Sequence, residues 1–210
     1  MDTLSIDIIS VIFEYLDTKE LIWASRTCKN WRRVFIKYLP KYKLNLYPYR
    51  YRITDADLVH LKGVHTINLF YCKQITDAGL VHLKGVHTID LSCCDQITDD
   101  GLVHLKGVHT IDLTCCYKIT DAGLVHLKGV HDINLWNCNK ITDAGLIHLK
   151  GVHTINLGDC YKITNVGLVH LLSSKGSEGV NTIDLTGCNL VTVVGLQILK
   201  NANPNVIIER

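Results

Sequence analysis

A unit of 22 residues repeats along most of this 210-residue chain and restricts its fold more than any other feature. The unit has the form ITDAGLVHLKGVHTINLxxCxx. Its first residue recurs at Ile53, Ile75, Ile97, Ile119, Ile141 and Ile163. Repeats of this length build solenoids, in which each unit is one coil of chain that packs only against its neighbours. Because such a molecule has no central core to enclose an active site, we expect its function on a surface.

Each copy of the unit predicts one strand and one short helix. In residues 86–91 apolar and polar side chains alternate and β-branched residues are frequent, as in a strand with one buried face. In the segment that follows, Thr98 is suited to cap a helix, Asp99 to its positive end and Gly107 to a left-handed exit. Each coil is therefore predicted to run strand, turn, short helix, turn.

The pattern extends beyond the clean copies at both ends. Leu44 and Leu46 indicate a first strand, Leu185 a seventh, and residues 206–208 an eighth that closes the solenoid. The sixth copy carries six extra residues, and its Ser- and Gly-rich segment 172–179 is predicted to be a surface loop.

The N-terminal segment has a different period. Between residues 4 and 39 apolar residues recur at spacings of three and four, which predicts three short amphipathic helices. Thr27 is suited to cap the third helix, and Pro40 to end it. We therefore divide the chain into residues 1–40 and a solenoid of about seven coils over residues 41–210.

Charge and composition exclude several classes of function. Residues 1–52 hold ten Lys/Arg against five Asp/Glu, whereas residues 53–210 hold twelve against fifteen. The solenoid is thus slightly acidic and a poor candidate for nucleic-acid binding. No apolar run approaches the roughly 20 residues that cross a bilayer, and no secretory signal is visible at the start. We expect an intracellular protein that does not enter a membrane.

The nine cysteines support the same compartment. Their number is odd, and most of them occupy one fixed place in the repeat, which is unlike a disulfide framework and indicates reduced thiols. The six at the fixed place are Cys72, Cys94, Cys116, Cys138, Cys160 and Cys188.

The repeat resembles the cysteine-containing class of leucine-rich repeats. The pattern V-x-x-I-x-L-x-x-C followed by ITDAGL carries this resemblance over residues 42–210. One copy consists of Val86, Ile89, Leu91, Cys94, Ile97, Gly101 and Leu102. The resemblance implies an α/β solenoid with a parallel sheet on its concave side and helices on its convex side. Because the 22-residue unit is shorter than usual for the class, we expect convex helices of little more than two turns.

The N-terminal segment LSIDIISVIFEYLDTKELIWASRTCKNW resembles an F-box. The matching residues are Leu4, Ile8, Ile9, Ile12, Phe13, Tyr15, Leu16, Leu21, Cys28, Lys29 and Trp31. Ser5 and Asp7 stand where the family prefers Pro and Glu. An F-box followed by such repeats is similar to the F-box/leucine-rich-repeat proteins, including the compact versions with near-identical repeats found in giant DNA viruses.

This resemblance implies a substrate receptor of an SCF-type cullin-RING ubiquitin ligase. The F-box would dock on the adaptor subunit through Leu4, Ile8, Ile9, Ile12, Leu16, Leu21 and Trp31, and the solenoid would hold a protein to be ubiquitinated. An apolar stripe on about 40 residues is more than so small a unit buries alone. An alternative is a stand-alone binding or inhibitory solenoid in which the F-box-like segment only caps the first coil.

All eleven histidines fall in two columns of the repeat. One column lies on the predicted helices, and the other comes just before the strands. The second consists of His65, His87, His109, His131 and His153. Imidazoles on adjacent strands would repeat every 4.8 Å or so, close enough to stack or to share a metal, and their protonation would be opposed by like charge. We favour duplication of one surface histidine and predict no metal and no cofactor.

Two further groups look chemical but have simpler interpretations. Cys93 and Cys115 each precede a repeat cysteine, which suggests zinc, but zinc needs four convergent ligands. Asp90 and Asp112 fall on adjacent strands, like a general acid/base pair, yet neither a nucleophile with an ordered base nor a phosphate-binding loop accompanies them. We therefore predict a binding protein, not an enzyme.

The copies differ most at the two positions after each strand. These pairs are Phe70-Tyr71, Ser92-Cys93, Thr114-Cys115, Trp136-Asn137, Gly158-Asp159 and Thr186-Gly187. Exposed aromatic residues there would suit a protein interface, although drift after recent duplication is an alternative. The predicted target-binding residues on or beside the concave face are Phe70, Tyr71, Asp90, Cys93, Asp112, Cys115, Trp136, Asn137 and Asp159.

Overall fold

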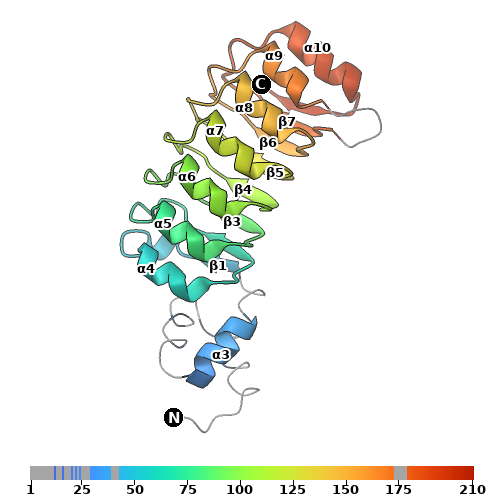
Figure 1. Cartoon of the computed structure of the whole chain (residues 1–210). Helices are drawn as coiled ribbons and strands as arrows, with labels where there is room; N and C mark the ends of the chain where they lie inside the picture. The colour runs from blue at the N-terminus through green and yellow to red at the C-terminus, as the bar shows by residue number, and fades with distance from the viewer. Residues whose placement is uncertain are drawn as a thin grey trace.

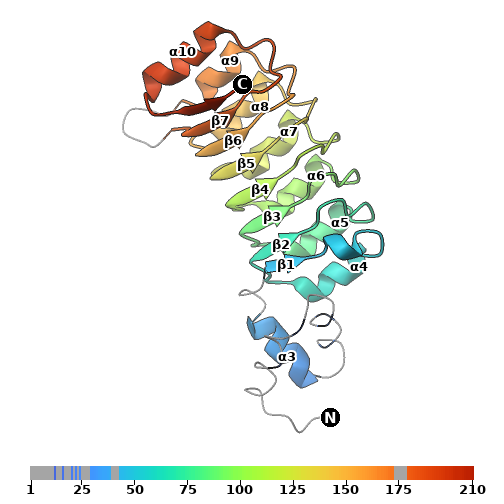
Figure 2. The ribbon, with the colours of Figure 1, turned by 180° about the vertical axis from the view of Figure 1, so that it is seen from behind.

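The computed structural model describes residues 12, 16, 20, 22, 24, 29–38, 43–172 and 179–210. Over the solenoid, eight parallel strands form one sheet whose order in space is their order in the sequence. The strands are β1 (Lys43–Asn45), β2 (Thr66–Asn68), β3 (Thr88–Asp90), β4 (Thr110–Asp112), β5 (Asp132–Asn134), β6 (Thr154–Asn156), β7 (Thr182–Asp184) and β8 (Ile207–Glu209). The sheet lines one side of the solenoid and the helices line the other (Figures 1 and 2). The predicted α/β leucine-rich-repeat solenoid is confirmed.

The convex side carries one short helix in each regular coil. The α-helices are α3 (Lys29–Tyr38), α4 (Asp55–Leu58), α5 (Asp77–Leu80), α6 (Asp99–Leu102), α7 (Asp121–Leu124), α8 (Asp143–Leu146), α9 (Asn165–His170) and α10 (Val193–Ala202). A 3-10 turn comes before α4 at η2 (Tyr47–Tyr49), and others follow α4 to α8 at η3 (Val59–Leu61), η4 (Val81–Leu83), η5 (Val103–Leu105), η6 (Val125–Leu127) and η7 (Ile147–Leu149). An α-helix and its 3-10 turn together make about two turns, as expected. None of the helices in the described part of the chain is long and apolar enough to cross a membrane.

The register of the sheet places identical residues side by side. Ile67 pairs with Ile89, and both are about 1% exposed, whereas the residues on either side of them face the concave surface. The same register holds from β1 to β8, even across the longer sixth coil, where Thr154 pairs with Thr182. The predicted insertion 172–179 lies mostly outside the described residues.

The repeat cysteines are part of the buried core. The Sγ of Cys94 donates to the Leu69 carbonyl oxygen at 3.1 Å, and Cys116 reaches Leu91 in the same way at 3.2 Å. Burial raises the pKa of Cys94 to about 12. These thiols therefore stay protonated and hold neighbouring coils together, which supports their interpretation as packing residues and weighs against a zinc site at Cys93 and Cys115.

We expect the buried thiols to resist alkylation. Thiolate is the reactive form of cysteine, and burial raises the pKa of Cys160, like that of Cys94, to about 12. Treatment of the folded chain with iodoacetamide at pH 8 should leave both residues unmodified by mass spectrometry, whereas the same treatment in denaturant should modify both fully. Rapid labelling of Cys94 in the native chain would contradict this account.

Neighbouring helices are joined by a carboxylate that the sequence pattern did not reveal. The backbone N–H of Thr120 donates to Asp99 Oδ1 at 2.8 Å, and its hydroxyl donates to Asp99 Oδ2 at 2.5 Å. The same hydroxyl accepts from the backbone N–H of Ala122, so Thr120 is the N-cap of α7, in the place predicted for Thr98 one coil earlier. This Asp–Thr bridge recurs between coils through Asp55, Asp77, Asp121 and Asp143, and Asn165 replaces the carboxylate at the last step.

The third predicted N-terminal helix is confirmed as α3, whereas the first two lie largely outside the described residues, as do Thr27 and Pro40. Val34 and Phe35 of α3 are each 1% exposed and belong to the same apolar core as Leu44 of the first coil. The segment before the solenoid therefore covers the first coil. The division of the chain near residue 40 stays a prediction.

Candidate protein-binding surface

The concave face of the sheet forms an open groove of about 660 Å³. Each strand points two of its three side chains toward the groove. One column is mostly Thr and the other is Asn or Asp. The floor residues of β2 to β7 are Thr66, Asn68, Thr88, Asp90, Thr110, Asp112, Asp132, Asn134, Thr154, Asn156, Thr182 and Asp184.

Asp90 and Asp112 lie on this floor, but both carboxylates already have structural partners. Asp90 Oδ1 accepts from the backbone N–H of Ser92 at 2.9 Å, and its Oδ2 accepts from Asn68 at 2.8 Å. Asp112 accepts in the same way from Thr114 and Asn134. Burial raises the pKa of Asp90, and the nearby Asp112 adds to the rise. Each carboxylate thus closes the turn after its strand, which supports a structural interpretation over an acid/base pair.

The other predicted target-binding residues do not line the groove. They lie one step further, in the turns at the carboxyl edge of the sheet. The second residue of each variable pair adopts a left-handed backbone, with φ of 61° at Tyr71, 59° at Cys93, 57° at Cys115, 59° at Asn137 and 56° at Asp159. Such a conformation is uncommon for residues other than glycine.

Hydrogen bonds to the next coil hold this conformation. The backbone N–H of Tyr71 donates to the Ser92 carbonyl at 2.8 Å, and that of Asn137 donates to the Gly158 carbonyl at 2.7 Å. The ladder of the sheet thus continues into the turns. The second residue of each variable pair therefore differs in side chain from coil to coil but has the same backbone conformation.

The first turns carry an aromatic cluster that sequence reasoning found only in part. Phe70 stacks on Tyr47 with ring centroids 5.1 Å apart, and Tyr71 meets the ring of Tyr51 edge-on at 6.2 Å. The guanidinium of Arg50 lies over Tyr47 at 4.2 Å and over Tyr51 at 4.4 Å. We call these five residues the aromatic cluster. Its missed members stand in the run YPYRYR before the first clean repeat, and that alternation of aromatic and basic residues was the available signal.

A second aromatic site lies further along the same edge. Trp136 is 36% exposed, and its indole covers Gly158, where a Cβ would overlap the ring. Asn137 donates to the hydroxyl of Tyr117 at 3.2 Å. Tyr117 is 48% exposed and Tyr161 is 50% exposed, and neither was predicted. The edge of the sheet, more than its face, therefore carries the exposed aromatic side chains.

The opposite, amino edge of the sheet carries the predicted histidine column. Neighbouring rings from His65 to His153 stack with centroids 4.5 Å apart and planes 12–23° from parallel, near the spacing expected for adjacent strands. Burial, His109 and His65 together lower the pKa of His87. In the last coil Asn181 takes the place of a histidine and lies 2.8 Å from His153 Nε2.

The structure describes three of the predicted adaptor-binding residues. Ile12, Leu16 and Trp31 are each half-buried, and the last two pack against the core of the solenoid. The remaining four, Leu4, Ile8, Ile9 and Leu21, lie outside the described residues.

Comparisons with known proteins agree with both parts of the sequence interpretation. Residues 1–41 match the family model of the F-box domain, and residues 86–106 match a leucine-rich-repeat model. The predicted order of an F-box followed by leucine-rich repeats is confirmed, and domains of these two kinds are typically binding modules without catalysis. Comparison with curated protein sequences found no match. The likeness to giant-virus proteins stays a prediction.

Solved structures share the fold. One of them is a chain from the crystal structure of the Rad7–Elc1 complex of yeast, with 17% sequence identity and a TM-score of 0.57. The alignment covers 76% of this chain and 44% of the yeast chain, so this chain spans less than half the length of its structural neighbour.

Proposed function

We propose that this chain is the substrate-recognition adaptor of an SCF-type cullin-RING ubiquitin ligase. The F-box binds the adaptor subunit, the solenoid binds a target protein, and the chain itself performs no chemistry. The observation that carries the proposal is the F-box match over residues 1–41, directly before a solenoid with an exposed aromatic edge. The yeast complex supports it, because Rad7 and Elc1 were solved together. The protonated repeat thiols suit a role inside the cell.

The charge and aromatic content of the solenoid indicate how the target is held. Aromatic residues and arginine are the side chains that contribute most to protein interfaces, and the aromatic cluster combines both. The Lys73 ammonium also lies 4.3 Å from the ring centroid of Tyr71 and pairs with Asp95. We propose that this edge is the main contact surface for the target and that the groove beside it adds further contacts.

Binding of the adaptor subunit tests the first half of the proposal. Ile12 is helical and half-buried, so Ile12→Asp places a charge in the predicted docking surface. We expect the full chain to co-purify with the adaptor subunit and Ile12→Asp to lose at least tenfold in affinity, or about 1.4 kcal/mol. Val193→Asp is the matched control, because Val193 is 74% exposed at the start of α10, at the other end of the solenoid.

Two outcomes would reject adaptor binding. One is a wild-type chain that folds but does not co-purify, and the other is an Ile12→Asp variant that binds as tightly as the control.

Targets are sought by comparing proteins captured by the wild type with those captured by a Tyr51→Ala, Tyr71→Ala double variant, which removes the edge-on ring pair and leaves the groove intact.

A second candidate function is a stand-alone binding scaffold whose N-terminal segment is only a cap. The burial of Val34 and Phe35 in the core of the solenoid favours a capping role. Capping and docking are compatible, since a cap buries one face of its helices and leaves the other free. A folded, monomeric chain that ignores the adaptor subunit would favour the scaffold.

A further inference from the structure

The histidine column contains one irregular coil. The residues that follow the five histidines of the column are Thr66, Thr88, Thr110, Asp132 and Thr154, so a carboxylate replaces a hydroxyl in one coil. Where Thr is present, the histidine Nδ1 lies 3.2–3.3 Å from its hydroxyl at three described coils. At the irregular coil, His131 Nδ1 instead lies 3.0 Å from Asp132 Oδ1.

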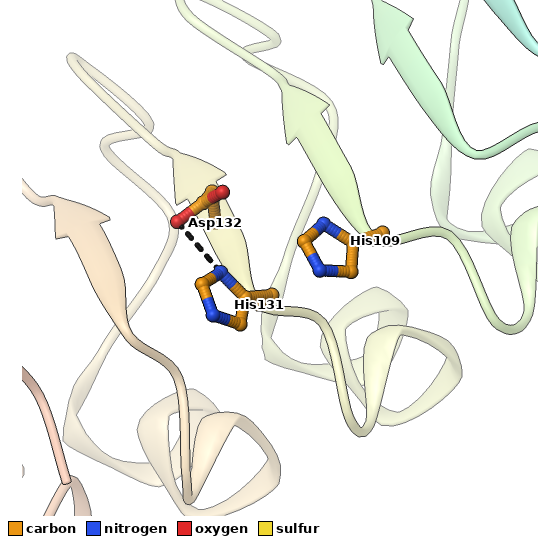
Figure 3. A group of neighbouring side chains, drawn as sticks. All are labelled: His109, His131 and Asp132. Carbon is orange, nitrogen blue, oxygen red and sulfur yellow. Dashed lines mark hydrogen bonds and ion pairs between the residues drawn. The ribbon is translucent and has the colours of Figure 1, made fainter. Parts of the chain in front are cut away.

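This substitution brings three ligand-type side chains together. His109 and His131 stack with centroids 4.5 Å apart and planes 13° from parallel, and Asp132 lies next to both (Figure 3). One ligand atom from each of the three lies within 4.8 Å of the other two. Although the sequence alone favoured a duplicated surface histidine without a metal, we propose from this arrangement that His109, His131 and Asp132 bind a divalent transition-metal ion such as zinc.

The donor set fits that class of ion. Imidazole nitrogen and carboxylate oxygen are ligands of zinc, copper and nickel, whereas magnesium and calcium prefer oxygen alone. Two neutral imidazoles and one carboxylate also leave a coordination position for water, as in many zinc sites with three protein ligands. The ion takes the place of the proton in the hydrogen bond between His131 Nδ1 and Asp132 Oδ1.

Metal binding requires the two stacked imidazoles to turn out of the column. Zinc holds nitrogen and oxygen ligands at about 2.0–2.2 Å, so the three atoms must come closer than they are, and the two rings must turn toward one point. The side chain of His131 is 42% exposed and that of Asp132 is 34% exposed, which leaves both open to an ion from solvent. Thr110 donates to Asp132 Oδ2 at 3.3 Å, and this hydrogen bond orients the carboxylate.

The repeat itself supplies the matched variants. Asp132→Thr restores the residue of the other coils, so it folds but lacks the third ligand. Thr88→Asp creates the same triad with His65 and His87, whose rings also stack at 4.5 Å. Zn²⁺ is titrated into each full-length chain at pH 7.5 in an isothermal calorimeter. Thermal unfolding confirms that all the variants are folded.

We expect one Zn²⁺ to bind the wild type in the micromolar range, at least tenfold weaker binding by Asp132→Thr, and a second equivalent with Thr88→Asp. Cobalt is then substituted for zinc to identify the ligands. Equal affinity of the wild type and Asp132→Thr, no saturable binding by the wild type, or a cobalt spectrum with thiolate charge transfer would each overturn the proposal.

Discussion

Replacing Phe35 by alanine is expected to destabilise the first coils by about 3–5 kcal/mol, the usual cost of removing a buried phenylalanine. Phe35 is 1% exposed and shares its apolar core with Leu44, which is 2% exposed at the start of the sheet. Truncation leaves a cavity in this core. Because a solenoid is stabilised by contacts between neighbours, the loss should appear first at the N-terminal end.

Hydrogen exchange read by mass spectrometry separates this local effect from global unfolding. We expect the amides of β1 and β2 to exchange faster in Phe35→Ala, while those of β5 and β6 change little. Phe70→Ala is the matched control, because Phe70 is half-buried in the aromatic cluster and should cost only about 1 kcal/mol. Unchanged protection of β1 in Phe35→Ala would show that the N-terminal segment folds apart from the solenoid.

Replacing Gly123 by alanine is expected to destabilise the chain by about 2–4 kcal/mol, since it combines overpacking with the loss of partly buried hydrogen bonds. The sign is opposite to the usual one, because alanine in a helix normally gains about 1 kcal/mol over glycine. A Cβ on Gly123 would overlap Asp99 Oδ1 and lie 3.0 Å from Leu102 Cδ1. The carboxylate that bridges to Thr120 must then move.

A double-mutant cycle tests this cause. Asp99→Ala alone leaves the N–H and hydroxyl of Thr120 without their acceptor, which should cost about 1–3 kcal/mol. In the double variant the overlap is gone. Its loss in free energy of unfolding should therefore be clearly smaller than the losses of the two single variants added together. The cycle is measured by urea unfolding. Full additivity, or a stabilised Gly123→Ala, would show that the carboxylate does not restrict this position.

Much of the fold could be predicted from sequence because its determinants are local and repeated. The alternation in residues 86–91 predicts a strand, and Thr98 and Gly107 predict the start and exit of a helix. The structure confirms all three, with Thr98 accepting from the backbone of Asp100 and Gly107 at a φ of 83°. Each such inference rests on the same local pattern in six copies of one unit.

The candidate surface was predictable only in part, because its members are far apart in the sequence. Tyr47 and Tyr51 lie before the first clean repeat, so comparison of the copies could not find them, and only the stacking of coils brings them against Phe70 and Tyr71. The left-handed backbone of the variable turns was likewise hidden. It depends on hydrogen bonds to the next coil, not on the residue itself.

The sequence by itself determined the solenoid, its period and the segments that become strands and helices, because local propensity and the period of burial act within one coil. Only the tertiary structure decided what the polar columns do. Because coils repeat at the spacing of a sheet, the histidine rings stack on one another and Asp99 accepts a hydrogen bond from Thr120 of the next coil. Asp90 accepts from the backbone of Ser92 and so stabilises the turn after its strand. The physical reason is that these roles depend on contacts between neighbouring coils. Residues about 22 positions apart in the sequence come into contact only in the folded solenoid.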